Sequence, residues 1–347
     1  MRGRICVRME SVMSERPKVV VTDFIEPNLD WEAGEVAKRG ADFTALQLKF
    51  RPEQEVIAAV KDADVIVVNM VKITPCLVDS LIKCRRIIRH GAGYDNVDVA
   101  ACTARGIPVA YCPDYCMDEV AEQAIALIFA CARQVPQSRK VLEDSIARGR
   151  WDFTPLAKCY RVAGKRLGII GCGRIGSRVL KKMRHFGFAE ILVCDPYLSR
   201  EQLTELGIAT VTKEKLFREA DYITIHTPLN DETRHMVNRE TLAMMKPTAY
   251  LVNTSRGPMV DHEALAEALR AKAIAGAGID VYDTEPPEQT YPLLGLENAI
   301  LTPHLAWYSE DAAWKIREDI VEDIDRALAG KPPRWCVNKE VLERAKR

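Results

Sequence analysis

The sequence predicts an α/β protein with two doubly wound parallel-sheet, Rossmann-like domains that are joined by two long helices and separated by a cleft. Three observations lead to this prediction. The 347 residues exceed the roughly 250–300 residues at which one hydrophobic core stops growing. Short apolar segments alternate with amphipathic helical segments in two separate series. A glycine-rich turn at 171–176 lies between an apolar segment and a helical one.

The first series begins at residue 18. Strands that are apolar throughout and alternate with helices indicate a parallel sheet covered on both faces. The alternation then pauses near residue 112, and apolar residues at helical spacing predict one long helix over 119–142. We expect strands of the first series at 19–24, 42–48, 65–70 and 85–91, and helices at 31–40 and 52–63.

The second series ends near residue 304 and is followed by a second long helix at about 309–329. We expect its strands to begin near residue 167 and to include 191–195, 222–226, 248–256, 276–282 and 299–304. Two long connecting helices predict that the C-terminal end returns to the first domain. The expected division is a disordered tail at 1–16 with Met1 or Met13 as the start, a first, discontinuous domain at 17–112 and 306–347, and a second domain at 113–305.

Composition excludes several classes of protein. Lysine plus arginine equals aspartate plus glutamate at 49 each, so no overall charge favours nucleic acid or an anionic membrane. The longest apolar run, 124–132, is far shorter than the roughly 20 residues that span a bilayer. The 11 cysteines include no CxxC pair and favour reduced thiols in a cytoplasm. No histidine lies near Cys112 and Cys116, so no metal site is expected.

The glycine turn matches the dinucleotide pattern G-x-G-x-x-G. Gly171 permits a tight turn, Gly173 lets the backbone approach a pyrophosphate, and Gly176 lets helix and strand pack closely. The helix that follows directs its N-terminus at the phosphate charge. Asp195 ends the next apolar segment, where a carboxylate bonds the ribose hydroxyls and repels a 2′-phosphate. NAD is therefore favoured over NADP, while a purely structural glycine turn is the alternative. The second domain, 113–305, is accordingly the expected NAD-binding domain, and 17–112 with 306–347 is the expected substrate-binding domain.

Three polar residues follow successive strands of the second series. Arg256 is suited to binding the carboxylate of a 2-keto acid through two hydrogen bonds. His304 is suited to exchanging a proton with the alkoxide near neutral pH. Glu285 would fix the imidazole and stabilise its cation. Each residue also has a structural alternative: Arg256 could form a salt bridge, His304 could cap a strand, and Glu285 could belong to an acidic turn.

With these residues in place, the chain resembles the D-isomer-specific 2-hydroxyacid dehydrogenase family over nearly all of residues 18–338. The segments that carry the resemblance are RHGAGYDNVD (89–98), GIIGCGRIGSRV (168–179), HTPLNDETRHM (226–236), LVNTSRGPMVD (251–261), GIDVYDTEPP (278–287) and TPHLAWYSE (302–310). PDYCMDEVAE (113–122), DPYL (195–198) and CVNKE (336–340) are most similar to the branch that contains bacterial relatives of the C-terminal-binding protein corepressors.

The resemblance implies roles for individual residues and a homodimer formed through the cofactor domain. It implies that Arg256, Glu285 and His304 are catalytic. It implies NAD binding by Gly171, Gly173, Arg174, Ile175, Gly176, Asp195, His226, Thr227, Pro228, Thr254 and, through the nicotinamide amide, Asp280. It implies substrate binding by Arg89, Gly91, Ala92, Gly93 and Trp307. An ion pair for Arg89 and helix packing for Trp307 remain alternatives.

The sequence therefore predicts a cytoplasmic NAD-dependent dehydrogenase that interconverts a small 2-keto acid and a D-2-hydroxy acid. The alternative is an NADH-sensing dimeric binding protein, similar to the corepressors, with vestigial turnover. Two differences from related dehydrogenases narrow the range of expected substrates. The segment 67–74 lacks the arginine usual in phosphoglycerate dehydrogenases, and Glu285 replaces the glutamine of formate dehydrogenases. Pro258 replaces the usual second glycine after the arginine, and no function follows from it.

Overall fold

The structure, a computed structural model, describes residues 16–344. The expected tail and both of its candidate start residues therefore lie outside the described residues, apart from Arg16. Contacts within the chain define two units. Unit 1 contains the residues up to Tyr115 and those from Ala313 onwards, and unit 2 is Cys116–Ala312.

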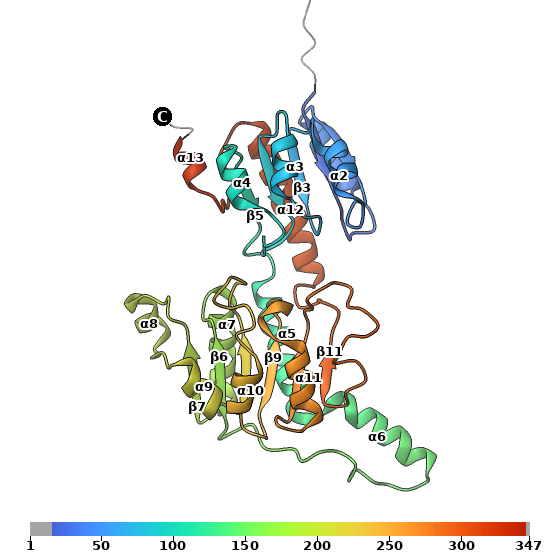
Figure 1. The fold of residues 1–347 in the computed structure, drawn as a ribbon, viewed down its shortest axis with the longest axis vertical. Coiled ribbons are helices and arrows are strands. Elements are labelled where there is room, and N and C mark those ends of the chain that lie inside the picture. Colours follow the sequence, from blue (N-terminus) through green and yellow to red (C-terminus); the bar gives the residue numbers. More distant parts are fainter. Residues whose placement is uncertain (1–15, 345–347) are drawn as a thin grey trace, which may run out of the picture. The chain divides into compact units, whose positions relative to one another are not determined.

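Unit 1 is a parallel sheet of five strands in the order β2-β1-β3-β4-β5 (Figure 1). Its strands are β1 (Lys18–Val21), β2 (Asp42–Ala45), β3 (Val65–Val68), β4 (Arg86–Arg89) and β5 (Val109–Tyr111). Its helices are α1 (Asp30–Lys38), α2 (Glu53–Val60), α3 (Pro75–Ser80), α4 (Val99–Ala104), α13 (Glu340–Arg344) and most of α12 (Glu310–Leu328).

Successive residues of the unit 1 strands pack into different cores. Val19 and Val21 of β1 pack with α1 and with α12 residues such as Ile320, whereas Val20 packs with α2 and α3. Side chains alternate across a pleated strand, so an apolar strand can fill a core on each face of the sheet. The covering by α12 brings the C-terminal end of the chain onto the first sheet.

Glu32 and Arg317 join α1 to α12 inside unit 1. Glu32 is 4% exposed, and its carboxylate accepts two hydrogen bonds from the guanidinium of Arg317, at 2.5 Å and 2.7 Å. Arg317 also lies over the rings of Trp31 and Trp314, 5.9 Å and 5.3 Å from their centroids. The arginine therefore supplies the charge that a buried carboxylate requires and a cation–π contact.

Unit 2 is a parallel sheet of six strands in the order β11-β10-β9-β8-β6-β7 (Figure 1). Its strands are β6 (Arg166–Ile170), β7 (Glu190–Cys194), β8 (Tyr222–Ile225), β9 (Tyr250–Asn253), β10 (Gly276–Ile279) and β11 (Ala299–Leu301). Its helices are α5 (Met117–Arg133), α6 (Val135–Ala147), α7 (Arg174–Met183), α8 (Arg200–Leu206), α9 (Lys213–Glu219), α10 (Arg239–Met244) and α11 (His262–Arg270), with 3-10 turns η1 (Arg184–Phe186) and η2 (Gly257–Met259).

Two cores lie on the two faces of the unit 2 sheet. Residues of α5 and α7, such as Leu127 and Leu180, form one core with Ile169 of β6. Residues of α9, α10 and α11 form the other, with Leu251 of β9 and Ile279 of β10. Helices on both faces of two wholly parallel sheets confirm the predicted fold class.

The single helix predicted over 119–142 is wrong, because the structure has two helices there. Gln134 ends α5 in the left-handed conformation with φ 51°, and α6 begins at the next residue. Pro136 follows in the first turn of α6, where its missing N–H costs no intrahelical hydrogen bond. The apolar periodicity continues across the break and therefore concealed it. No helix in the described part of the chain has both the length and the apolar composition needed to cross a bilayer.

The buried pair of Glu32 and Arg317 yields a stability prediction for unit 1. Arg317→Ala leaves a buried carboxylate without its cation, which should lower the free energy of unfolding by roughly 3–5 kcal/mol. Chemical denaturation followed by tryptophan fluorescence measures this, since Trp31 and Trp314 flank the arginine. Arg51→Ala is the matched control because Arg51, which precedes α2, pairs with Glu55 at the exposed surface, where a pair contributes about 0–1 kcal/mol. Equal losses in both variants would contradict the prediction.

Candidate active site

The glycine turn, residues 171–176, connects β6 to α7 and leaves space for a ligand at one position. A Cβ on Gly171 would lie 2.8 Å from the His226 backbone, and one on Gly176 would lie 2.0 Å from the Gly171 carbonyl oxygen. A Cβ on Gly173 would meet no atom within 4 Å. Two of the glycines are thus required by packing, whereas Gly173 borders open space at the N-terminus of α7. This is the arrangement in which a pyrophosphate approaches the backbone.

Asp195 directly follows β7, which pairs with β6. One carboxylate oxygen accepts a hydrogen bond from the Cys172 amide at 2.8 Å, and the other accepts one from the Tyr197 amide at 3.0 Å. The first bond comes from within the glycine turn. The carboxylate is therefore held beside the turn, where the sequence places the ribose of a bound dinucleotide.

Two buried polar atoms follow the neighbouring strands β8 and β9. Burial lowers the pKa of His226 to about 3, so its imidazole is neutral. Its Nε2 lies 2.9 Å from the Thr224 hydroxyl, while its Nδ1 and the Thr254 hydroxyl have no hydrogen-bond partner in the described residues. Buried polar groups of this kind normally have partners. Both atoms fit a site that a bound cofactor completes.

The other predicted cofactor residues lie at this edge of the sheet. Arg174 and Ile175 form the first turn of α7, and Thr227 and Pro228 follow His226 after β8. Since the carboxyl ends of parallel strands share one edge, the loops after β6, β7, β8 and β9 border the same region of unit 2.

His304 and Glu285 form a direct pair. The Nδ1 atom of His304 lies 2.7 Å and 2.9 Å from the two carboxylate oxygens of Glu285. Burial raises the pKa of Glu285, but the hydrogen bond and charge of His304, with the amide of Tyr282 and the charge of Arg256, outweigh this and hold the pKa below its ordinary value. Within the described residues the Nε2 atom of His304 makes no hydrogen bond, so this nitrogen can face a substrate.

The backbone of His304 has φ 51°, a left-handed conformation that a residue with a side chain rarely adopts. Asp280, which is fully buried, holds it there. Its carboxylate accepts hydrogen bonds from the Thr302 hydroxyl and from the amides of Leu305 and Ala306, at 3.1 Å and 2.9 Å for the amides. Its carbonyl oxygen accepts one from the His304 amide at 2.8 Å. We call residues 302–306 the His304 loop.

Arg256 follows β9 and belongs to the same group of residues. One Nη atom donates to the Ser255 carbonyl at 2.8 Å, and its positive charge contributes to the low pKa of Glu285. The next residue packs against the backbone that leads to Glu285, because a Cβ on Gly257 would lie 2.1 Å from Tyr282. The structure thus brings the three predicted catalytic residues of unit 2 together.

The predicted substrate residues of unit 1 lie in one loop. Arg89 ends β4, and its guanidinium folds beneath the following loop to donate to the carbonyl of His90. Gly91 has φ 143°, and a Cβ there would lie 2.0 Å from that guanidinium. Ala92 and Gly93 continue the loop. The guanidinium of Arg89 therefore supports the loop, and the contact of these residues with a substrate stays a prediction.

Trp307 in unit 2 is half-buried beside the His304 loop. Its ring meets that of Tyr308 edge-on, with centroids 5.4 Å apart. The predicted contact of Trp307 with the substrate stays a prediction, as does the predicted contact of Asp280 with a nicotinamide. The positioning role of Asp280 was missed because the sequence gives no sign that a residue after β10 bonds a loop after β11. The sequence showed only that Asp280 directly follows a strand of small residues, which does not indicate its partner.

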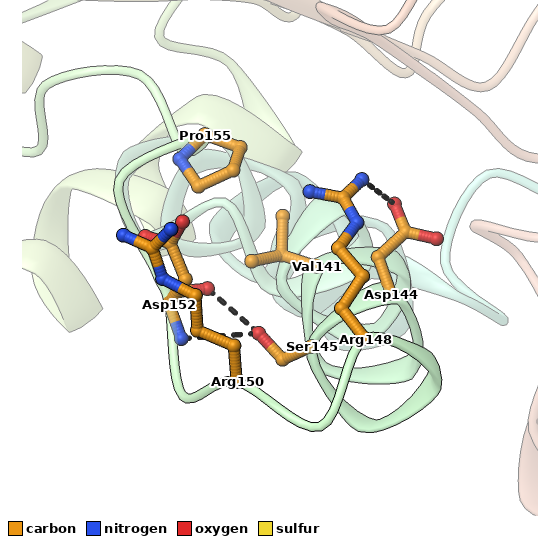
Figure 2. A pocket seen from close by; sticks show the side chains of 7 residues that line it. All are labelled: Val141, Asp144, Ser145, Arg148, Arg150, Asp152 and Pro155. Carbon is orange, nitrogen blue, oxygen red and sulfur yellow. Dashed lines mark hydrogen bonds and ion pairs between the residues drawn. The ribbon is translucent and has the colours of Figure 1, made fainter.

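A separate hollow lies on α6 and the segment that follows it (Figure 2). Ser145 and Asp152 line it and join α6 to the segment after it. The Ser145 hydroxyl donates to the Asp152 carbonyl at 2.8 Å and accepts from the Asp152 amide at 3.2 Å. Arg148 and Asp144 form a loose ion pair at its rim, 3.9 Å apart. No predicted catalytic, cofactor or substrate residue lines this hollow, so it is not the candidate active site.

A doubly wound sheet with this glycine turn, an acid after the neighbouring strand and a histidine–carboxylate pair at the same edge defines a dinucleotide-binding α/β protein. Residues 125–306 match the model of the D-isomer specific 2-hydroxyacid dehydrogenase, NAD binding domain. The chain belongs to the D-isomer-specific 2-hydroxyacid dehydrogenase family. This confirms the predicted family and the predicted class of cofactor, a nicotinamide dinucleotide.

Relatives from three organisms illustrate the range of the family. The chain is 39% identical to a D-3-phosphoglycerate dehydrogenase of Methanocaldococcus jannaschii over 82% of its own length, but it spans about half, 54%, of that relative. It is 38% identical to a glyoxylate reductase of Korarchaeum cryptofilum, over 83% of this chain and 86% of the relative. The crystal structure of D-lactate dehydrogenase from Aquifex aeolicus, complexed with NAD and lactic acid, has a TM-score of 0.79 at 28% identity and covers 94% of this chain and 97% of that chain.

The pair of His304 and Glu285 yields a prediction for the pH dependence of turnover. The low pKa of Glu285 keeps a negative charge beside the imidazole, which favours the imidazolium. In Glu285→Gln the imidazolium should lose its proton more easily, so the basic limb of the kcat/KM profile for keto acid reduction should move down by about one to two pH units. Steady-state rates from pH 5 to 10 measure this, and an unshifted limb would remove Glu285 from proton transfer.

Proposed function

We propose that this protein is an NAD-dependent D-2-hydroxyacid dehydrogenase that interconverts a small 2-keto acid and the corresponding D-2-hydroxy acid. One observation carries the proposal. The imidazole of His304 is paired through Nδ1 with Glu285, its Nε2 makes no hydrogen bond in the described residues, and the pair shares a sheet edge with the glycine turn. This edge can hold a dinucleotide and a proton donor together.

Each of the three residues has a defined task in this proposal. Arg256 binds the substrate carboxylate with two parallel hydrogen bonds, which also orients the carbonyl. His304 donates the proton from Nε2 to the oxygen that becomes the hydroxyl, and accepts it in the reverse direction. Glu285 holds the ring through Nδ1 and stabilises its cation. A bound reduced nicotinamide supplies the hydride.

The substrate is proposed to be a small 2-keto acid without a phosphate. The relatives named above act on glyoxylate, lactate and phosphoglycerate by their names, which share a 2-oxygenated carboxylate. The segment 67–74 offers Lys72 but no arginine, which disfavours a phosphorylated substrate. Arg89, the loop from Gly91 to Gly93 and Trp307 are the proposed determinants of the side chain that is accepted.

We further propose NAD rather than NADP as the cofactor and the cytoplasm as the location. The Asp195 carboxylate is fixed beside the glycine turn, where it would repel a 2′-phosphate. The ten cysteines in the described part of the chain are all free thiols, which is typical of a reducing compartment.

A homodimer through unit 2 is proposed on the basis of an exposed apolar segment. We call residues 135–155, which comprise α6 and the stretch after it, the arm; α6 extends from the body of unit 2 (Figure 1). Ile146, Trp151 and Phe153 on the arm are 70%, 84% and 69% exposed. Large apolar side chains gathered on one surface of a folded protein mark an interaction site. A second copy of the arm would cover them.

The binding-protein alternative predicts no dependence of function on the catalytic pair. A binding protein requires the dinucleotide to change affinity for a peptide, but it does not require an imidazole held for proton transfer. The strained backbone of His304, maintained by buried Asp280, favours the enzyme.

The enzyme proposal is tested by NADH oxidation with glyoxylate, hydroxypyruvate, pyruvate and phenylpyruvate. We expect turnover of at least one of them, and His304→Ala should lower kcat by about 10²–10⁴-fold with unchanged NADH affinity. Arg256→Ala should impair all active substrates alike, because it binds the carboxylate that they share. His185→Ala, a change of an exposed histidine in η1, is the matched control and should retain full activity. Full activity in His304→Ala would refute the mechanism.

The dimer proposal is tested by light scattering coupled to size exclusion. The wild type should have the mass of two chains at micromolar concentration. Trp151→Ser combined with Phe153→Ser should shift it toward one chain, because the interface loses its largest apolar side chains. Phe50→Ser removes an equally exposed phenylalanine, 77% exposed in unit 1, and should leave the dimer intact. A dimer unaffected by the double change would exclude the arm.

A further inference from the structure

The loops after β7 and β8 are bridged across the end of β6. The sheet order places β6 between β7 and β8, so the glycine turn is flanked by the loop that contains Tyr197 and the loop that contains Glu232. The phenolic hydroxyl of Tyr197 donates a hydrogen bond of 2.5 Å to the carboxylate of Glu232. Ligands of doubly wound sheets lie at this position, where the chain leaves the sheet in opposite directions. The bridge therefore spans the adenosine half of the cofactor site.

The bridge connects two carboxylates. The amide of Tyr197 donates to Asp195, and its hydroxyl donates to Glu232, so a different carboxylate holds each end of the tyrosine. Tyr197 is 73% exposed and Glu232 is also exposed, which means that core packing does not account for their contact. Glu232 raises the pKa of the Tyr197 hydroxyl through this bond, with a smaller contribution from the charge of Asp195. Both negative charges thus act on the same tyrosine.

The loop that carries Glu232 is itself well held. The Glu232 amide donates to the side chain of Asn230 at 3.0 Å, and the Thr233 hydroxyl donates to the Pro228 carbonyl at 2.7 Å. These bonds fix the backbone from which the glutamate projects. The loop therefore fixes the backbone of Glu232, and the hydrogen bond from Tyr197 orients its carboxylate.

We propose that Glu232, held by Tyr197, is a second carboxylate that selects NAD against NADP, and that the Tyr197 ring forms the outer wall of the adenosine site. The inference rests on the proposed function. Asp195 reaches the ribose hydroxyls directly, whereas Glu232 acts at longer range on the charge of a 2′-phosphate. Repulsion of the pyrophosphate is common to NAD and NADP and cancels in the preference between them, whereas repulsion of the 2′-phosphate acts on NADP alone.

The expected effect is modest and depends on salt. Repulsion between one carboxylate and a phosphate near −2, in water over roughly the span of a tyrosine side chain, changes affinity about fivefold. Added salt screens exposed charges beyond about 10 Å at 0.1 M ionic strength and beyond about 3 Å at 1 M. The selectivity due to Glu232 should therefore fall as salt is raised.

The experiment measures dissociation constants of NADH and NADPH by nucleotide fluorescence, without substrate, at low and high salt. Glu232→Gln retains a hydrogen-bond acceptor for Tyr197 and removes only the charge. Tyr197→Phe retains the ring and removes the bridge. Glu219→Gln is the matched control, since Glu219 ends α9 just before β8 begins and so lies at the opposite edge of the sheet. Its pair with Arg166, at 3.4 Å, is also on the surface.

We expect Glu232→Gln to reduce the NADH-over-NADPH preference about three- to tenfold at low salt, mostly by tighter NADPH binding, and less at high salt. Tyr197→Phe should reduce the preference by a smaller factor with NADH affinity retained, and Glu219→Gln should match the wild type. An unchanged preference in Glu232→Gln, or equal weakening of both nucleotides, overturns the inference but not the proposed function. Failure of the wild type to bind either nucleotide overturns both.

Discussion

The buried carboxylate of Asp280 is the constraint on which the candidate active site depends. It lies at the end of β10 and bonds the Thr302 hydroxyl and the amides of Leu305 and Ala306 after β11. A carboxylate taken out of water requires such donors, and here they all come from the His304 loop. Burial raises the pKa of Asp280, and the hydrogen bonds from the loop counteract this. The contacts that satisfy the buried carboxylate are thus the same contacts that place His304, the predicted catalytic histidine.

Strand order along the carboxyl edge of the unit 2 sheet separates the residues proposed to bind the cofactor from those proposed to act in catalysis. The strands β7, β6 and β8 carry the residues that suit an adenosine and a pyrophosphate, whereas β9, β10 and β11 lead to Arg256, Glu285 and His304. A dinucleotide is long enough to extend along such an edge. In the proposed function, the positive N-terminus of α7 faces the phosphates at the centre, and the acids after β7 and β8 lie toward the adenosine end, away from the reaction. The edge therefore has a positive helix end at its centre and carboxylates beside it, which matches the order of pyrophosphate and ribose in a dinucleotide.

The sequence predicted the strands and the residues that follow them because both depend on local patterns. Arg256, Glu285 and His304 were predicted as site residues from their places after apolar segments, and the glycine turn was predicted from spacing and strand–helix context. The contact of Asp280 with Ala306, and that of Tyr197 with Glu232, join segments far apart in the chain, and no local pattern encodes them. The break at Gln134 was missed for a different reason: an apolar stripe continues through it, and a single left-handed residue leaves no periodic signal.

His304 is constrained from two sides, through its backbone and through its ring, and both constraints suit the proton transfer that we propose for it. The backbone at φ 51° is unfavourable for a side chain and persists only where the surroundings fix it. Asp280 fixes the backbone through the His304 loop, and Glu285 fixes the ring through Nδ1. With the backbone fixed, rotation of the His304 side chain would break the contact between Nδ1 and Glu285. Its Nε2 therefore points in one direction. In the proposed mechanism, the strained backbone thus sets the position of the proton donor before a substrate binds.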